Sequence, residues 1–263
     1  MTENTFPSVT EQPILYDWLY HDTDKDIEMY RRLTEGHSVI LECAVGTGRL
    51  TIPWARQGKT VYGIDYSAEM LAQFQNKLRA LPEETRSRIH LQQADMRDFD
   101  LQRKFTFVCI PFGSFIYLLT LEDQKACLAS LRRHLADDGT IVIDLPTWQE
   151  AMDEKWLAND SVLRKDKQLV DPQTGKTVEM WSTFRFDAST QINEQDRHYR
   201  IYGKDGVLER EQVVFWQTRF FLLGEFQLLL ELSGLKIAEV YGDFQFGPYR
   251  HDSEAAVVVI KPA

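Results

Sequence analysis

The sequence predicts an α/β fold: a seven-stranded, mostly parallel sheet with helices on both faces and an antiparallel β insertion. Two observations predict the sheet. Short apolar runs alternate with segments of helical spacing, and a turn with two glycines joins the first run to its helix. A third observation predicts the insertion, since residues 162–219 alternate with the period of two that strands show. Together these features are typical of a Rossmann-like sheet whose right-handed crossovers are interrupted once.

The first half of the chain supplies four of the expected strands. Residues 14–33 carry apolar positions at helical spacing, broken near residues 21–24, and predict two short helices before the first strand. Ser67 is a good N-cap for a later helix. Strands are expected at residues 39–42, 60–64, 89–92 and 105–110, with helices at residues 49–57 and 68–80 and a polar loop through residues 82–87.

The second half completes the same sheet. A turn at Asp138 and Gly139 is expected to separate a helix from the fifth strand. The remaining helices are expected at residues 121–135 and 224–233, and the remaining strands at residues 140–145, 236–241 and 255–260.

The inserted segment divides the chain into two expected units. Three turn signals punctuate it: Thr174-Gly175, Ala188-Ser189 and Asp205-Gly206. We expect residues 1–150 and 220–263 to form the α/β domain, and residues 151–219 to form an antiparallel β insertion. That insertion would cover a ligand site, make a dimer contact, or do both.

Charge and composition limit the class of partner. The 263 residues include 40 acidic and 30 basic side chains, for a formal net charge of -10, which disfavours nucleic acid or an anionic membrane. There is no apolar run long enough to span a bilayer, and the N-terminus lacks the order of a secretion signal. We expect a cytoplasmic monomer or homodimer that acts on a small molecule, with no nucleic acid and no membrane partner.

Cysteines and histidines do not predict a metal centre. Cys43, Cys109 and Cys127 lack metal-ligand spacing and are expected to be reduced core residues. Each of the six histidines is isolated, so no metal is expected. His198 lies in the insertion and His251 precedes the last strand. Both segments are expected to cover a ligand site, so these two histidines are candidates for contact with a ligand.

The glycine turn, Ala44-Val45-Gly46-Thr47-Gly48, lets a backbone approach a ligand closely. A dinucleotide-binding loop would have a third glycine where Thr51 stands, and no lysine with serine or threonine follows as in phosphate-binding loops. The turn alone is therefore weak evidence for a ligand.

The ends of four strands strengthen that evidence. Glu42 ends the first, Asp65 the second, Asp95 with Met96 the third, and Ile110 the fourth. Open α/β sheets bind ligands at this carboxyl edge. Acids at three successive tips suit a ligand with an ammonium group, ribose hydroxyls and an exocyclic amine, and they would repel a pyrophosphate.

At these residues the chain resembles the class I S-adenosylmethionine-dependent methyltransferases, over roughly residues 16–151 and 220–261. The first motif of that family, acid-x-G-x-G-x-G, reads Glu42-Cys43-Ala44-Val45-Gly46-Thr47-Gly48, with alanine in place of the first glycine. The resemblance implies S-adenosylmethionine as co-substrate and no metal.

The resemblance also implies a role for the residues at and near the strand ends. Glu42 would order the loop and lie near the methionine amino group, and Asp65 would hold both ribose hydroxyls. Tyr66 and Met70 would flank the adenine, whose amino edge would meet Asp95 and Met96. The predicted cofactor-binding residues are Tyr16, Glu42, Ala44, Gly46, Gly48, Arg49, Asp65, Tyr66, Met70, Asp95, Met96 and Ile110.

The order of the motifs YDWLY, ADMRDF and IPFGSFIYLL and of the insertion resembles small-molecule N-methyltransferases, in particular the amino-sugar N,N-dimethyltransferases. In those enzymes a tyrosine of the N-terminal helix reaches the cofactor, which maps onto Tyr16, with Tyr20 and Tyr30 as alternatives. They carry a histidine near the acceptor amine where this chain has Tyr117. We predict Tyr16, Tyr117 and His198 as catalytic residues.

The walls of the acceptor site are expected to be aromatic, because aromatic faces attract a sulfonium or ammonium ion. The aromatic candidates are Tyr16, Phe112, Phe115, Tyr117, Trp148 and Trp181. The residues that could bind an acidic acceptor, or lie on a solvated sheet face, are Arg197, Arg200, Tyr202 and Arg250.

The sequence thus predicts S-adenosylmethionine-dependent transfer of a methyl group to a small soluble acceptor, with nitrogen the favoured atom. Two alternatives stay open. One is an S-adenosylmethionine-binding protein whose acceptor space is blocked by Tyr117 or Trp148; the other is a nicotinamide-dependent oxidoreductase, which Thr51 and the three acids disfavour. No residue pattern identifies the acceptor or a general base.

Overall fold

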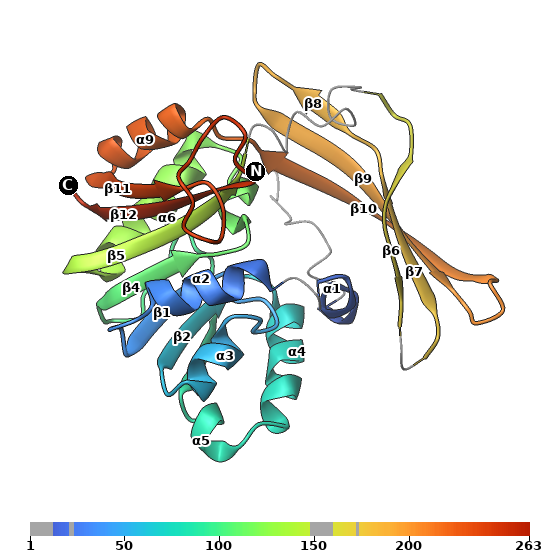
Figure 1. Ribbon diagram of the computed structural model, residues 1–263, viewed down its shortest axis with the longest axis horizontal. Coiled ribbons are helices and arrows are strands. Elements are labelled where there is room, and N and C mark those ends of the chain that lie inside the picture. The colour runs from blue at the N-terminus through green and yellow to red at the C-terminus, as the bar shows by residue number, and fades with distance from the viewer. Residues whose placement is uncertain (1–12, 21–23, 148–159, 172–173) are drawn as a thin grey trace.

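The computed structural model describes residues 13–20, 24–147, 160–171 and 174–263, and Figure 1 shows their arrangement. The helices are α1 Pro13–Leu19, α2 Lys25–Leu33, α3 Thr51–Arg56, α4 Ala68–Arg79, α5 Glu83–Arg86, α6 Leu121–His134 and α9 Leu223–Leu232, with a 3-10 turn, η2, at Ser114–Tyr117. The strands of the large sheet are β1 Val39–Cys43, β2 Thr60–Asp65, β3 Ile89–Gln93, β4 Phe105–Ile110, β5 Leu135–Pro146, β11 Leu235–Tyr241 and β12 Ala255–Pro262. The strands of the second sheet are β6 Arg164–Val170, β7 Thr177–Ser182, β8 Arg185–Asp187, β9 Ile192–Tyr202 and β10 Leu208–Arg219.

The large sheet has seven strands in the order β11-β12-β5-β4-β1-β2-β3. Neighbouring strands among β1 to β5 pair in parallel, whereas β12 runs antiparallel to both β5 and β11. The order reverses between β1 and β4, which leaves a crevice at the carboxyl ends of these strands. The predicted fold class, a mostly parallel seven-stranded sheet with an antiparallel insertion, is confirmed.

Helices cover both faces of this sheet (Figure 1). On one face, Tyr30 of α2 and Trp54 of α3 pack with strand residues such as Phe107. On the other face, Leu128 of α6 and Phe226 of α9 join a second buried cluster. Because both faces are covered, the central strands are apolar almost throughout instead of alternating.

The second sheet is antiparallel, in the order β10-β9-β7-β6, with β8 paired to β9. One of its faces packs against α1, where Leu15 and Leu19 meet Val178, Tyr199 and Trp216. Figure 1 shows α1 lying between the α/β body and this sheet. The inserted strands therefore face the carboxyl edge of the large sheet across α1.

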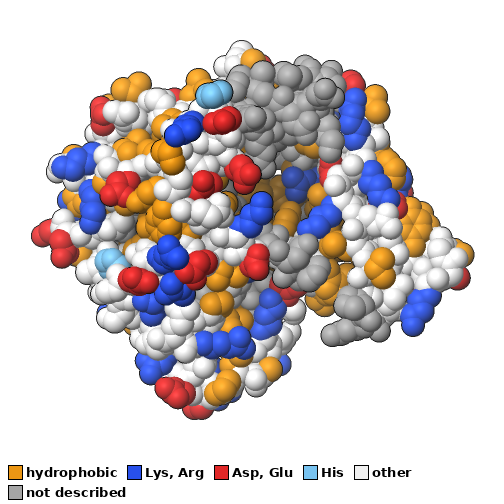
Figure 2. Space-filling view, in the orientation of Figure 1, with side chains coloured by type: hydrophobic (Ala, Val, Ile, Leu, Met, Phe, Trp, Pro, Cys, Tyr) orange, Lys and Arg blue, Asp and Glu red, His pale blue; other side chains and the backbone are white. Residues whose placement is uncertain are grey.

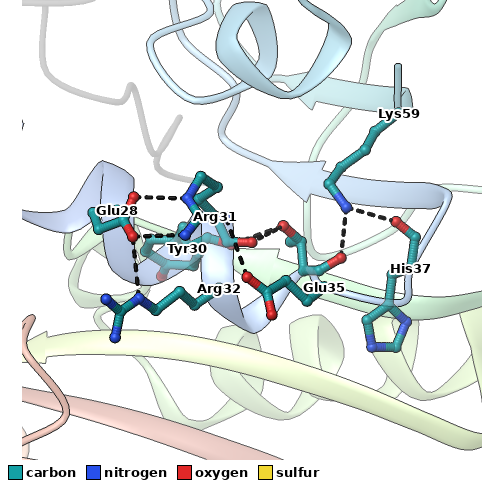
Figure 3. Close-up of polar contacts among 8 residues, drawn as sticks. Glu28, Tyr30, Arg31, Arg32, Glu35, His37 and Lys59 are labelled. Atoms are coloured by element: carbon teal, nitrogen blue, oxygen red, sulfur yellow. Dashed lines mark hydrogen bonds and ion pairs between the residues drawn. The ribbon is translucent and has the colours of Figure 1, made fainter. Parts of the chain in front are cut away.

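Polar contacts fasten α2 to the start of β1 and β2 (Figure 3). The Lys59 ammonium donates to the backbone oxygens of Thr34, at 2.6 Å, and His37, at 3.0 Å. On the outer side, Glu28 pairs with Arg31 and Arg32, although such exposed ion pairs stabilise little. The anchored helix directs the buried Tyr30 side chain into the sheet.

The prediction of a turn at Asp138 and Gly139 is wrong, because both residues lie within β5. Strand β5 begins directly after α6, and its pairing with β4 jumps from Phe105↔Leu135 to Phe107↔Thr140. The extra residues form a bulge within the strand, which accommodates Gly139 without a chain reversal. The short helix α5 likewise lies where a loop was expected, after Pro82.

No helix in the described ranges is long and apolar enough to cross a membrane. All three cysteines are buried free thiols.

Candidate functional site

A cavity of about 250 Å³ lies at the carboxyl edge of the large sheet, between that sheet and the antiparallel one. Figure 2 shows the surface hollowed between the two bodies, with hydrophobic and basic side chains beside the hollow. Its lining residues are Tyr16, Tyr20, Ala44, Gly46, Ile64, Asp65, Tyr66, Met70, Ala94, Asp95, Met96, Phe112, Ser114, Tyr117, Arg197 and Trp216. The structure thus brings most of the residues singled out in the sequence to one place. Of the twelve predicted cofactor-binding residues, four lie outside the lining: Glu42, Gly48, Arg49 and Ile110.

The glycine turn shows why its residue types matter. Gly46 has φ +56°, and a Cβ there would meet no atom within 4 Å, so its backbone is open toward the cavity. Gly48 has φ +88°, and a Cβ would lie 2.3 Å from the ring of Phe74 in α4. Gly48 therefore serves the packing of α4 under the loop. Ala44 also has a positive φ, 59°, a conformation that costs a non-glycine residue about 1–2 kcal/mol.

Asp65 is held rigidly at the cavity wall. Its carboxylate accepts the Gly46 backbone N–H at 2.7 Å and the Ser67 backbone N–H at 2.9 Å. Burial raises the pKa of Asp65, and these backbone donors partly offset that rise. A carboxylate has about four acceptor positions, so each oxygen retains capacity for a ligand hydroxyl.

Asp95 lines the cavity in an ion pair. Arg97 binds its carboxylate with Nε at 3.0 Å and Nη2 at 2.6 Å, and also reaches Asp123 at 2.8 Å. Sequence reasoning missed Arg97, although it stands two residues after Asp95 in the motif ADMRDF. The pairing orients the Asp95 carboxylate at the cavity wall.

Glu42 lies beneath the glycine turn, 2% exposed, where the Thr51 hydroxyl donates to its carboxylate. Burial raises the pKa of Glu42 to about 8. Thr51, which stands where a dinucleotide loop has its third glycine, thus holds the Glu42 side chain in place at the end of β1.

We expect ligand-free stability to fall as the pH rises from about 5 to 8, because an ordinary glutamate has a pKa of about 4.3 and Glu42 binds its proton more tightly when folded. Glu42→Gln should flatten this decline. Melting temperatures of both proteins between pH 6.5 and 8.5 provide the measurement, since Asp144, whose pKa is about 6, titrates mainly below this window. Parallel curves for the two proteins would contradict the expectation.

Helix α1 is fastened over the turn by Asp17. Its carboxylate accepts from the Thr47 hydroxyl and the Lys77 ammonium, both at 2.6 Å, and from Gln73 at 3.1 Å. This attachment places the Tyr16 ring in the cavity wall. Burial raises the pKa of the Tyr16 phenol, so its hydroxyl stays protonated at neutral pH.

Arg49 lies outside the cavity lining and packs against one of the lining residues, Phe112. Its guanidinium forms a bidentate ion pair with the buried Asp26, at 2.5 and 2.6 Å, and lies 4.6 Å from the centre of the Phe112 ring. Phe112 in turn packs edge-on against Tyr16 and Tyr20. Arg49 thus orients aromatic residues that line the cavity.

Asp144 is a further functional candidate that sequence reasoning missed. It is 5% exposed at the end of β5 and accepts hydrogen bonds from the Tyr30 hydroxyl at 2.5 Å and from the backbone N–H groups of Phe112 at 2.9 Å and Gly113 at 2.8 Å. Burial raises its pKa to about 6. The signal for it was an acid inside an otherwise apolar fifth strand, at the same edge as the other tips.

The structure does not bring His198 to the cavity. Successive side chains of β9 point to opposite faces, so Arg197 lines the cavity while His198 pairs with Glu211 at 3.1 Å on the other face. Arg200 shares that outer face and contacts Trp181.

The other predicted wall residues divide similarly. Phe115 is buried in the core against Phe221 and Phe226, and the His251 side chain is 95% exposed. Arg250 is also exposed, whereas Trp148 lies outside the described residues. Tyr117 lines the cavity and packs against Trp216 of β10.

Comparisons with known proteins agree with this geometry. Residues 40–139 match a family described as methyltransferase domain. The chain is 33% identical over 165 residues to the dTDP-3-amino-3,4,6-trideoxy-alpha-D-glucopyranose N,N-dimethyltransferase of Streptomyces venezuelae, covering 59% of this chain and 65% of that relative. It therefore spans just under two thirds of the length of this relative.

Solved structures show the same fold. The CcbJ methyltransferase of Streptomyces caelestis has a TM-score of 0.76 at 22% identity, covering 91% of this chain and 90% of that one. The S-adenosylmethionine-bound CalS10, an amino pentose methyltransferase of Micromonospora echinaspora, has a TM-score of 0.68 at 21% identity, covering 93% and 92%.

Proposed function

We propose that the chain is a class I S-adenosylmethionine-dependent methyltransferase that transfers a methyl group from S-adenosylmethionine to a nitrogen of a small soluble acceptor. The match of residues 40–139 to a methyltransferase domain and the similarity to a sugar N,N-dimethyltransferase support this proposal. The observation that carries the proposal is the convergence of the Asp65 carboxylate, the open backbone at Gly46 and the paired Asp95 in one cavity. The match to a methyltransferase domain disfavours the nicotinamide-dependent alternative.

The residues of the cavity fit this co-substrate. Asp65 would accept hydrogen bonds from the ribose hydroxyls. Tyr66, Met70, Asp95 and Met96 line the same cavity and would hold the base. Gly46 admits the methionine part close to the backbone, because a Cβ there would project into open space. The cofactor-binding residues are proposed on this basis.

When bound, S-adenosylmethionine supplies an electrophilic methyl group on a sulfonium sulfur. The protein holds the acceptor in line with that group and keeps water away, which supplies most of the acceleration in reactions of this kind. The rings of Tyr16, Tyr20 and Phe112 present electron-rich faces that stabilise positive charge. Tyr117 bounds the space opposite the strand tips and is proposed to orient the acceptor.

Nitrogen is the proposed acceptor atom. The curated relative is named as an N,N-dimethyltransferase of an amino sugar, and an uncharged amine already has a lone pair and needs no base for attack. Among the described residues of the lining, the acids are Asp65 and Asp95, and both carboxylates are held by protein donors. The protein therefore favours an acceptor that enters as the free amine.

Calorimetry with S-adenosylhomocysteine, the expected product, tests the proposal on purified protein stripped of bound nucleosides. We expect one saturable site per chain, and no comparable binding of a nicotinamide dinucleotide under the same conditions. An absence of S-adenosylhomocysteine binding by a protein with a cooperative melting transition would overturn the proposal.

A further inference from the structure

Arg197 is a cation in the cavity wall whose recorded partners are all neutral. Its Nε donates to the Gln195 side-chain oxygen at 2.9 Å, and its guanidinium lies 4.3 Å from the centre of the Trp216 ring and hydrogen bonds with Tyr199. Within the described ranges, no carboxylate pairs with it. A cation withdrawn from water loses hydration that neutral partners replace only in part.

The other arginines near the cavity differ in this respect. Arg49 pairs with Asp26, Arg97 with Asp95 and Asp123, and Arg219 with Glu225. Each of these cations is neutralised by the protein itself. Arg197 differs from these arginines because no carboxylate of the described residues pairs with it. It lies in the cavity wall, where a ligand can supply a carboxylate or another anion.

The position of Arg197 separates it from the proposed cofactor residues. Arg197 and Trp216 belong to β9 and β10 of the antiparallel sheet, whereas Asp65 and Asp95 stand at the strand tips of the large sheet. Tyr117 lies beside Trp216, on the acceptor side.

This side of the cavity is rich in hydrogen-bond donors. Tyr16, Tyr20 and Tyr117, whose side chains carry hydroxyl groups, belong to the lining. The buried indole Nε1–H of Trp216 finds no acceptor among the described residues. A wall with surplus donors and a cation complements a group that has only acceptor atoms and negative charge.

We propose that Arg197 binds an anionic oxygen group of the methyl acceptor, a carboxylate or a phosphate, so that the substrates are small amines carrying such a group. The inference rests on the proposed function, since it assumes that an acceptor occupies this side. The planar guanidinium, stacked on Trp216, presents two parallel N–H donors that match two oxygens of either anion.

The test uses the full-length protein saturated with S-adenosylhomocysteine. Acetate and inorganic phosphate are titrated separately at constant ionic strength, with tryptophan fluorescence as the readout, because Trp216 lies under Arg197. We expect saturable binding of one anion, weakened at least about tenfold by Arg197→Met, the loss typical of a charged hydrogen bond. Arg197→Lys, which keeps the charge but lacks the fork, should fall between the two.

Arg200→Met is the matched control. Arg200 is on the same strand but on the opposite face, paired with Glu211, and its removal should leave the anion titration unchanged. Stronger binding of acetate identifies a carboxylate group, and stronger binding of phosphate identifies a phosphate.

Two results would overturn the inference: saturable binding of neither anion to the wild-type complex, or equal binding by Arg197→Met and the wild type. Failure of S-adenosylhomocysteine itself to bind would instead defeat the proposed function. The same titrations on the unloaded protein would then decide whether Arg197 is an anion site.

Discussion

Asp65→Asn is expected to weaken the binding of S-adenosylhomocysteine by roughly 100-fold or more. Two hydroxyl donors would lose a charged acceptor, and each such hydrogen bond contributes about 1.5–3 kcal/mol, where 1.4 kcal/mol corresponds to tenfold. The substitution also turns an N–H donor toward Gly46 or Ser67, whose backbone N–H groups now donate to this carboxylate. Calorimetry on the wild type and the variant measures the ratio of dissociation constants.

Asp98→Asn serves as the control, because its side chain is 92% exposed and it follows β3, the strand that pairs with β2. It should bind like the wild type. Melting curves of both variants show whether they are folded. A dissociation constant for Asp65→Asn within about threefold of the wild type would mean that Asp65 does not hold the ribose, since such a change is below the value of one hydrogen bond.

The strand tips could be predicted because they follow from local pattern. Apolar runs mark β1, β2 and β4, and a parallel sheet brings the carboxyl ends of its strands to one edge. Asp65 and Asp95 therefore reach the same cavity without any knowledge of long-range packing. The left-handed backbone of Gly46 is likewise a local consequence of its missing Cβ.

The antiparallel sheet shows where such reasoning stops. Alternation identifies two faces of β9 but does not say which one packs against α1. Arg197 and His198 are adjacent in sequence, and both faces carry aromatic and charged residues. The choice depends on the docking of Leu15 and Leu19 against Tyr199, a contact between segments about 180 residues apart in the chain. The prediction that His198 faces the cavity was therefore wrong, whereas Arg197, a candidate for binding an acidic acceptor, does line it.

Asp144 was missed for a related reason. Its partners Phe112 and Tyr30 lie 32 and 114 residues away, and Phe112 has φ +58°, which a phenylalanine rarely adopts. Nothing in the local sequence predicts that conformation. It persists because Asp144 binds the N–H groups of Phe112 and Gly113 together.

We therefore expect Asp144→Ala to lower the free energy of unfolding by about 3–5 kcal/mol, because three donors, one buried and two partly buried, lose their acceptor at about 1–3 kcal/mol each. The sum is reduced because the buried carboxylate is itself costly, as its raised pKa shows. At about 2–4 °C per kcal/mol for a protein of this size, the melting temperature should fall by roughly 10 °C. Urea unfolding followed by circular dichroism supplies the free energies.

Two further variants provide comparisons for the stability of Asp144→Ala. Tyr30→Phe removes one donor and leaves both backbone bonds to Asp144, so it should cost only about 1–2 kcal/mol. Asp137→Ala, on the same strand but 96% exposed, should stay within about 0.5 kcal/mol of the wild type. If Asp144→Ala proved as stable as Asp137→Ala, the left-handed turn at Phe112 and Gly113 would hold its shape without the carboxylate. The aromatic wall that it presents to the cavity would then owe its position to the packing of Phe112 against Tyr20 and Arg49.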